Sequence, residues 1–561
     1  MAVDKGQGAG RWRARAVQDL RRALFLIKTR GPSQVQFWFI ALAIGIAAGT
    51  VALLFRLAIS LIQSTVYGTD DVRLLHSFAA GLDWYQVLLI PICGGLVVGL
   101  IFHRFTEDGR VRSVADVIEG AALNEGRVEV RRGLASGAAS LVTLGTGGST
   151  GREGPVVHLA AVISTVICKF IRADGVTGRD LLGCAVAAAV SASFNAPIAG
   201  ALFALEVVLR HFAVHAFAPI AIASVAGTVV NRAILGDFSE FAMPEQPMLA
   251  FYQELPAFML LGLLCGAVAV VLMRAIFWAD RVADAATAAT RLPRVLRPAV
   301  TGALLGLLAI GFPHIIGVGY ETTARALDGS IPVVTAVAFI AVKVAAVAIT
   351  MAGRMGGGVF SPALMIGALT GVAFGLTATA IFPEVSGSHT LYALAGMGGV
   401  AAAVLGAPIS TTLIVFELTG DWQIGIAVMT SVSLSTALAS RLVDRSFFLT
   451  QLERRHIHLA AGPQAYLLAM FRAGAVMRPL GDARAPDRAA LEALAGEGLK
   501  VEASSTLEAA MAVFEREDVP CLAVMIRDAE GAEDLVGALF HVDALRAYNR
   551  ALAATAAEEH S

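Results

Sequence analysis

The chain of 561 residues is 57% hydrophobic and only 16% charged, and its mean hydropathy is +0.71. These values exclude an intrinsically disordered chain, which needs low hydrophobicity and a high net charge. They also exclude an ordinary soluble domain, roughly 25% charged, as an account of the whole chain. The net charge of −1 gives no reason to expect a nucleic-acid partner.

The charged residues are spread unevenly and divide the chain into regions. Residues 1–34 carry eight basic and two acidic side chains, residues 35–450 are about 12% charged, and residues 451–561 are about 25% charged. We therefore expect a basic segment at 1–34, a membrane domain at 35–450 with halves at about 35–235 and 250–450, a linker at 451–470, and a soluble unit at 471–561. Positive residues beside a first span stay in the cytoplasm, so the N-terminus is expected there.

The membrane domain mixes long apolar runs with short, interrupted ones. Runs of the length that a span needs lie at Phe37–Ile62, Val87–Phe102, Phe258–Trp278, Val333–Met351 and Ile424–Leu442. Shorter pieces cut by Gly and Pro lie at Pro155–Ile171, Leu181–Ala192, Ala196–Leu209 and Pro362–Ile381. Broken helices in a membrane need protein or a watery cavity around their ends, so this pattern predicts a transporter or channel core.

A glycine-rich segment, Gly145–Pro155, opens the first of these short helices. Glycine lets backbone N–H groups approach a ligand, and the N-terminus of a helix favours an anion. Glu153 lies at this helix start inside a membrane segment, where ionisable residues are costly and are functional candidates. Its carboxylate is predicted to occupy the anion site and to leave on protonation.

A second segment, Gly356–Pro362, has the same arrangement in the other half. Glycines again precede a proline that starts an apolar helix. We expect the two helix starts to point at one shared anion.

An internal repeat supports this two-half organisation. Ala196-Pro197-Ile198 is followed by Leu202 and Glu206, and Ala407-Pro408-Ile409 is followed by Leu413 and Glu417 at the same spacing. Similar interrupted segments in corresponding halves indicate a binding site at the interface between repeats. Glu206 and Glu417 are expected to serve as structural hydrogen-bond partners.

These residues resemble the CLC family of chloride channels and proton–chloride antiporters. Gly151-Arg152-Glu153-Gly154-Pro155 is similar to the family's GREGP segment with its gating glutamate. Gly358-Val359-Phe360-Ser361-Pro362 is similar to its GxFxP segment, whose backbone binds chloride. Phe194–Pro197 with Glu206 also fits the family pattern.

The resemblance implies an all-α polytopic fold of about 18 helices in two inverted halves. It also implies a homodimer with a pore in each subunit, located in the bilayer of a bacterial inner membrane with both termini cytoplasmic. The transported ion would be chloride or a similar monovalent anion such as fluoride or nitrate. No enzyme activity, cofactor or metal site is expected.

Three positions depart from the family pattern. The first anion-binding segment falls on Val111–Ala115, where Arg112 takes the serine position and Ser113 follows. Arg112 either attracts anions or is a solvated loop cation. The pore tyrosine falls near Phe448, which can form a constriction but has no hydroxyl for chloride. The proton-accepting glutamate falls on Val207, beside Glu206, which favours a channel-like or weakly proton-coupled pathway. An antiporter with another proton route is the alternative.

Two cations in the second half have open roles. Lys343, inside an apolar segment, is expected to snorkel, to cap a carbonyl or to line the pore. Arg354, before the glycine run, is a candidate contributor to the anion potential.

The last region, residues 471–561, is predicted to be a small α/β unit. A helix from Thr506 to Phe514, with Ser504 or Ser505 as its N-cap, precedes strands at Val519–Met525 and Leu535–Phe540 and a helix at Val542–Leu552. This order is similar to a single CBS domain, which would pair across a dimer axis. Nucleotide binding there is possible, but no residue set demands it.

A remote alternative is an intramembrane serine hydrolase. Gly147–Gly151 matches G-x-S-x-G around Ser149, and His158 lies nearby. That motif needs a strand-to-helix elbow and a third residue, and no third residue is evident.

Overall fold

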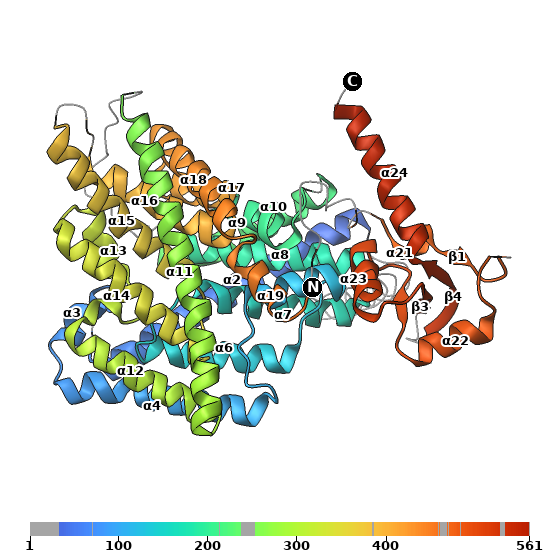
Figure 1. Cartoon of the computed structure of the whole chain (residues 1–561), viewed down its shortest axis with the longest axis horizontal. Coiled ribbons are helices and arrows are strands. Elements are labelled where there is room, and N and C mark those ends of the chain that lie inside the picture. Colours follow the sequence, from blue (N-terminus) through green and yellow to red (C-terminus); the bar gives the residue numbers. More distant parts are fainter. Residues whose placement is uncertain are drawn as a thin grey trace, which may run out of the picture.

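The structure is a computed structural model. It describes residues 33–69, 71–212, 214–236, 253–383, 386, 388–457, 459, 468, 471–482, 484–527 and 533–559. Nearly all of the basic segment at 1–34 and most of the linker at 451–470 lie outside these residues. A large helical body and a small α/β unit stand side by side (Figure 1), which confirms the predicted fold class.

The first half of the body runs from α2 to α10. Its longest helix, α2, is capped at its N-terminus by the Ser33 side chain and at its C-terminus by Gly68 in the left-handed conformation. The elements are α2 (Gln34–Tyr67), η1 (Val72–Leu74), α3 (Leu75–Ala80), α4 (Trp84–Phe105), α5 (Val114–Leu123), α6 (Val130–Gly145), α7 (Glu153–Ile171), α8 (Gly175–Phe194), α9 (Pro197–Phe203), η2 (Ala204–Leu209) and α10 (Val214–Leu235).

The second half runs from α11 to α19. Its elements are α11 (Leu255–Thr290), α12 (Arg297–Gly311), η3 (Pro313–Ile315), α13 (Tyr320–Leu327), α14 (Val333–Ala352), α15 (Phe360–Ile381), α16 (His389–Leu405), α17 (Pro408–Thr419), α18 (Trp422–Leu442) and α19 (Phe447–Glu453). Eighteen α-helices, α2 to α19, therefore make up the described body.

Eight described segments are long and apolar enough to cross a membrane, and four more are apolar but short. The five spans expected from the sequence all fall within such helices, so the chain is an integral membrane protein. Two of the pieces that were expected to be short are longer than predicted. α7 has 19 residues and α15 has 22, because each begins before its proline, which occupies the first turn.

The repeat has a structural counterpart at the starts of α9 and α17. Asn195 (φ 59°) ends α8 and Gly406 (φ 69°) ends α16, both in the left-handed conformation, and Pro197 and Pro408 then start the next helix. The glutamate of each half accepts hydrogen bonds from the backbone of the other half. The Glu206 carboxylate accepts from the N–H groups of Ile409 (2.9 Å) and Ser410 (2.8 Å).

The Glu417 carboxylate accepts from the N–H groups of Ile198 (3.0 Å) and Ala199 (2.7 Å). Each carboxylate thus caps the helix N-terminus of the other half. Such a pairing ties the two repeats together, as was expected of these residues.

The α/β unit contains a four-stranded sheet in the order β1-β4-β3-β2. β2 pairs parallel with β3, and the other pairs are antiparallel. The elements are α21 (Ala473–Val476), β1 (Arg478–Pro479), α22 (Arg488–Gly496), β2 (Lys500–Glu502), α23 (Leu507–Glu517), β3 (Cys521–Arg527), β4 (Glu533–Phe540) and α24 (His541–Glu559).

The unit differs from the sequence-based expectation in its two additional short strands, β1 and β2, and in the cap of α23. The N-cap of α23 is Thr506, whose hydroxyl accepts from the Ala509 N–H (3.3 Å), so Ser504 and Ser505 are not the cap. The Ser505 hydroxyl instead donates to Glu125 in the helical body (3.1 Å). Two ion pairs, Arg210–Glu508 (3.2 Å) and Arg472–Asp174 (3.9 Å), join the same surfaces.

Candidate anion site

The two glycine motifs meet at the centre of the helical body. The Gly151 N–H donates to the Gly358 carbonyl (2.7 Å), and the Gly358 N–H donates back to Gly151 (2.8 Å). Gly356 (φ 98°) and Gly357 (φ 117°) take conformations that L side chains rarely adopt. This short antiparallel bridge holds the starts of α7 and α15 against each other.

Glu153 lies at this junction, as the first residue of α7, and is only 3% exposed. Its Oε1 accepts a hydrogen bond from the Ser361 hydroxyl at the start of α15. The Arg152 guanidinium is 4.0 Å from the same oxygen. The carboxylate therefore sits at the positive end of a second helix, which is the environment that favours an anion.

A narrow cavity of about 20 Å³ adjoins the carboxylate, which is room for one water-sized particle. Glu153 is the one charged side chain among the described residues that line it. Several predicted site residues share this lining, namely Ser113, Gly154, Gly358, Val359, Phe360 and Phe448. The remaining motif residues lie in the same two segments, namely Gly151, Arg152, Pro155, Ser361 and Pro362.

Aromatic rings narrow the cavity. Phe448 is 5% exposed and stands edge-on to Phe447, with ring centres 5.8 Å apart. Phe360 packs against Phe194 (4.7 Å) and Phe203 (6.1 Å). The cavity wall thus offers apolar surface and backbone N–H groups with few fixed charges.

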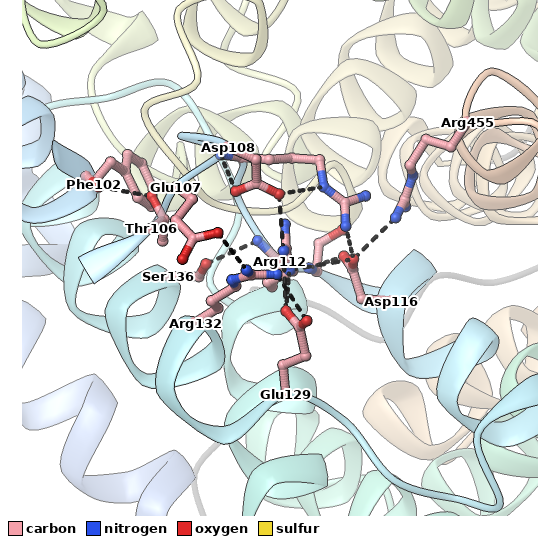
Figure 2. Close-up of polar contacts among 12 residues, drawn as sticks. Phe102, Thr106, Glu107, Asp108, Arg112, Asp116, Glu129, Arg132, Ser136 and Arg455 are labelled. Carbon is pink, nitrogen blue, oxygen red and sulfur yellow. Dashed lines mark hydrogen bonds and ion pairs between the residues drawn. The ribbon is translucent and has the colours of Figure 1, made fainter. Parts of the chain in front are cut away.

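Arg112 does not face this cavity. It is 4% exposed, so the solvated-cation interpretation is wrong. Its guanidinium bonds to Asp108 (2.9 Å) and Glu129 (3.0 Å) and lies 3.9 Å from Asp116 (Figure 2). The backbone N–H of Arg112 donates to the Ser136 hydroxyl (2.9 Å). The positive charge is therefore balanced by carboxylates.

Ser113, the next residue, does line the cavity. Its N–H donates to Asp116 (2.8 Å) and its carbonyl lies 3.3 Å from His158 Nδ1. The carboxylate network around Arg112 thus also holds this loop against the cavity.

Val207 is buried in η2 and is not among the cavity residues. Its neighbour Glu206 is occupied with capping α17. Neither residue places a proton acceptor beside Glu153.

A wider vestibule of about 470 Å³ continues from the cavity. The two spaces share Ser113, Met351, Gly357 and Gln451. The vestibule is charged, with Arg110, Asp280, Asp284, Arg354, Arg454 and Arg455 in its wall. Met351 and Gln451 were missed from the sequence because each is one unremarkable residue near a helix end.

A second cleft of about 700 Å³ is lined by Arg152 and Tyr320, together with residues of η1, α3 and α13. Of these elements, α3 and α13 lie at the end of the body away from the sheet (Figure 1). The Arg152 guanidinium lies over the Tyr320 ring at 5.3 Å and donates to the Ser193 carbonyl (3.1 Å). Glu153 therefore lies between a cleft on one side and a vestibule on the other.

Lys343 and Arg354, whose roles the sequence does not decide, both have polar partners. The Lys343 ammonium is fully buried and donates to the carbonyls of Ile315 (3.1 Å) and Gly317 (3.0 Å), so it caps the end of η3. The Arg354 guanidinium pairs with Asp284 (3.3 Å) at the edge of the vestibule.

Ser149 has no hydrolase geometry among the described residues. Its N–H donates to the Thr350 hydroxyl (3.2 Å), while His158 bonds to the Ser113 carbonyl. The segment joins two helices, α6 and α7, where the hydrolase motif requires a strand before the serine.

Comparison with known proteins identifies the family. The profile of the voltage-gated chloride channel family matches residues 94–440, which is more than half of the chain. The chain belongs to the CLC family.

Two relatives and one solved structure illustrate this membership. A ClcB-like chloride channel protein of Ralstonia nicotianae is 32% identical over 70% of this chain and 90% of its own length. The H⁺/Cl⁻ exchange transporter ClcA of Vibrio vulnificus is 28% identical over 76% of this chain and 91% of its own. A eukaryotic CLC transporter structure, 17% identical, matches with a TM-score of 0.64 over 93% of this chain and 98% of its own. That likeness shows a shared fold.

Proposed function

We propose that this CLC protein carries chloride across a membrane through the cavity beside Glu153, with the Glu153 carboxylate as the gate. One observation carries the proposal: the carboxylate accepts a hydrogen bond from Ser361 at the start of α15, where an anion would be held. The Glu153 carboxylate, which is itself an anion, and a chloride ion compete for the same helix dipole at the start of α15. Chloride enters when the carboxylate moves out of this position or is neutralised.

We propose further that transport is channel-like or weakly coupled to protons. Val207 has no ionisable group, and both oxygens of Glu206 accept from α17. Among the cavity-lining residues, Glu153 is the sole carboxylate. A proton that moves from the vestibule to Glu153 thus meets no second carboxylate among the described residues that line the cavity.

The proton-coupled alternative rests on a different observation. The vestibule adjoins the cavity and carries Asp280 and Asp284 in its wall, and one relative carries the name of an H⁺/Cl⁻ exchange transporter. Water in that space would supply a route that bypasses position 207.

Reversal potentials of the reconstituted protein under crossed chloride and pH gradients distinguish the two. A passive pathway gives the chloride Nernst potential at every pH gradient. A reversal potential that shifts with the proton gradient supports exchange and contradicts the channel-like proposal. Absence of any anion current or flux contradicts the transport proposal itself.

We also propose a homodimer, with the sheet-bearing face in the cytoplasm. The outer surfaces of α9, α10, α17 and α18 expose large apolar side chains, among them Ile198 (54%), Val229 (56%), Ile409 (47%) and Met429 (52%). Such surfaces suit a second subunit as well as lipid. Cross-linking in native membranes tests the dimer, and labelling of single cysteines in the sheet of sealed vesicles tests the orientation.

A further inference from the structure

A second charged cavity lies beside the vestibule, with which it shares Asp108, Asp284 and Arg354. It lies on the face that carries the sheet, because a neighbouring pocket contains its residues Glu129, Arg132 and Lys169 together with Arg527 of β3. It encloses about 960 Å³ between the ends of α4, α7 and α11 and the starts of α6 and α12. Its lining contains seven arginine or lysine side chains and four carboxylates. We call this space the basic cleft.

The four carboxylates of the basic cleft are all neutralised by partners. Glu107 pairs with Arg132 (3.4 Å), and Asp108 and Glu129 pair with Arg112 (Figure 2). Asp284 pairs with Arg297 and Arg354. None of them is left to balance the remaining cations.

Three exposed cations of the cleft, Arg104, Arg131 and Lys169, pair with no carboxylate within the part of the chain that the structure describes. Arg294, a fourth, donates to the backbone carbonyl of Glu107 (3.5 Å). The cleft therefore has a concave shape and an uncompensated positive charge, which together favour a polyvalent anion.

The position of these cations favours a phosphate that belongs to a lipid. Arg104 lies in the last turn of α4 and Lys169 in the last turn of α7, and both helices are long and apolar enough to span a membrane. Exposed apolar side chains lie next to the cations on the same helices, namely Leu100 (59%), Leu134 (53%) and Phe170 (54%). A basic group at the end of an apolar helix stripe is the arrangement that meets a headgroup while acyl chains follow the helix.

We propose that the basic cleft binds the phosphate group of an anionic phospholipid from the leaflet next to the sheet-bearing face. Arg104, Arg131 and Lys169 would contact the phosphate, and the apolar stripes of α4, α6 and α7 would contact the acyl chains. This binding is separate from the proposed anion pathway and does not depend on which ion the protein transports.

The basic cleft is linked to the vestibule by residues that line both spaces. Arg354 lines both spaces and shares Asp284 with Arg297. A phosphate in the cleft competes with Asp284 for these two guanidinium groups. Binding would therefore shift the charge at the vestibule wall, so lipid composition would modulate anion flux.

Native mass spectrometry of the purified full-length protein tests the proposal with two lipids, phosphatidylglycerol and phosphatidylcholine. The wild type is expected to retain phosphatidylglycerol preferentially. In Arg104→Gln/Arg131→Gln, this preference should fall by roughly thirtyfold, because two cations that face the lipid phosphate are removed. A control, Arg281→Gln/Arg441→Gln, removes two exposed arginines outside the cleft and should keep the preference.

Other outcomes overturn the proposal. Equal retention of both lipids by the wild type excludes a headgroup site, and equal losses in the two double variants indicate a general surface charge effect. Binding of inorganic pyrophosphate, measured in parallel, tests whether the cleft takes a soluble phosphate compound. If it binds in a manner that Arg104→Gln/Arg131→Gln abolishes while lipid retention is unchanged, the cleft takes free phosphate compounds and the lipid source is wrong.

Discussion

The anion cavity and the face that carries the sheet handle charge in opposite ways. Glu153 is the one charged side chain among the described residues that line the cavity, and its partners are a hydroxyl, the start of a helix and, at 4.0 Å, the Arg152 guanidinium outside the lining. Around Arg112, cations and carboxylates lie a few ångströms apart and neutralise one another (Figure 2). A fixed cation in a narrow, poorly hydrated space would bind chloride too firmly for release, whereas dipoles and a movable carboxylate permit exchange.

The largest effect is expected from changing the one carboxylate of the cavity. Glu153→Gln removes the internal anion but keeps the shape of the side chain, so any proton movement should stop and chloride flux should persist or rise. Glu153→Ala should behave alike. Chloride efflux and proton uptake by proteoliposomes measure both quantities. Proton pumping by Glu153→Ala liposomes against a chloride gradient would falsify the gate assignment.

The next effect concerns the backbone that joins the two motifs. A Cβ at Gly357 would lie 2.1 Å from the Thr150 hydroxyl oxygen, and its φ of 117° strains any L side chain. Gly357→Ala should therefore cost about 1–3 kcal/mol and abolish anion flux. Gly311→Ala is the control, since no atom lies within 4 Å of its Cβ position. Wild-type flux in Gly357→Ala would show that the close approach of α7 and α15 is dispensable.

A smaller effect is expected on the charged face. Arg112→Gln leaves Asp108 and Glu129 without their shared guanidinium, and these carboxylates are 40% and 55% exposed. Water can solvate these two carboxylates in part, so we expect the free energy of unfolding to fall by about 1–2 kcal/mol. Anion selectivity should stay unchanged.

Thermal unfolding and bi-ionic potentials measure these two quantities for Arg112→Gln. Arg112→Lys keeps the positive charge but lacks the planar guanidinium that bonds two carboxylates at once. Its stability should lie between that of the wild type and that of Arg112→Gln. A change in selectivity with unchanged stability would place the charge of Arg112 in the pathway after all.

The sequence predicts best those features that depend on local chemistry. The helix starts near Pro155 and Pro362 follow from Gly and Pro positions that few other structures accommodate, and each helix begins two residues before its proline. The partners of Arg112 were missed because they come from residues 4 to 24 positions away. The N-cap of α23 was misplaced because Ser505 has a tertiary partner, and β1 and β2 are too short to leave a pattern.

The smallest effect is expected where the two regions of the molecule join. Burial, followed by the neighbouring Glu502 carboxyl, raises the pKa of Glu125 to about 7 from an ordinary value of 4.5. The docked state therefore binds a proton that the undocked state releases. The stabilisation of docking by this proton is full below about pH 4.5 and is lost as the pH rises through about 7. Hydrogen exchange of β2 and the start of α23 should accelerate over that range.

Two variants at this junction separate protonation from simple contact. Glu125→Gln imitates the protonated carboxyl and still accepts from Ser505, so exchange in β2 should lose its dependence on pH beyond the intrinsic rate. Glu508→Gln removes the charge that pairs with Arg210 in the same interface, which should weaken docking but leave the titration of Glu125 in place. If Glu125→Gln kept the wild-type pH profile, the titrating group would lie elsewhere in the junction.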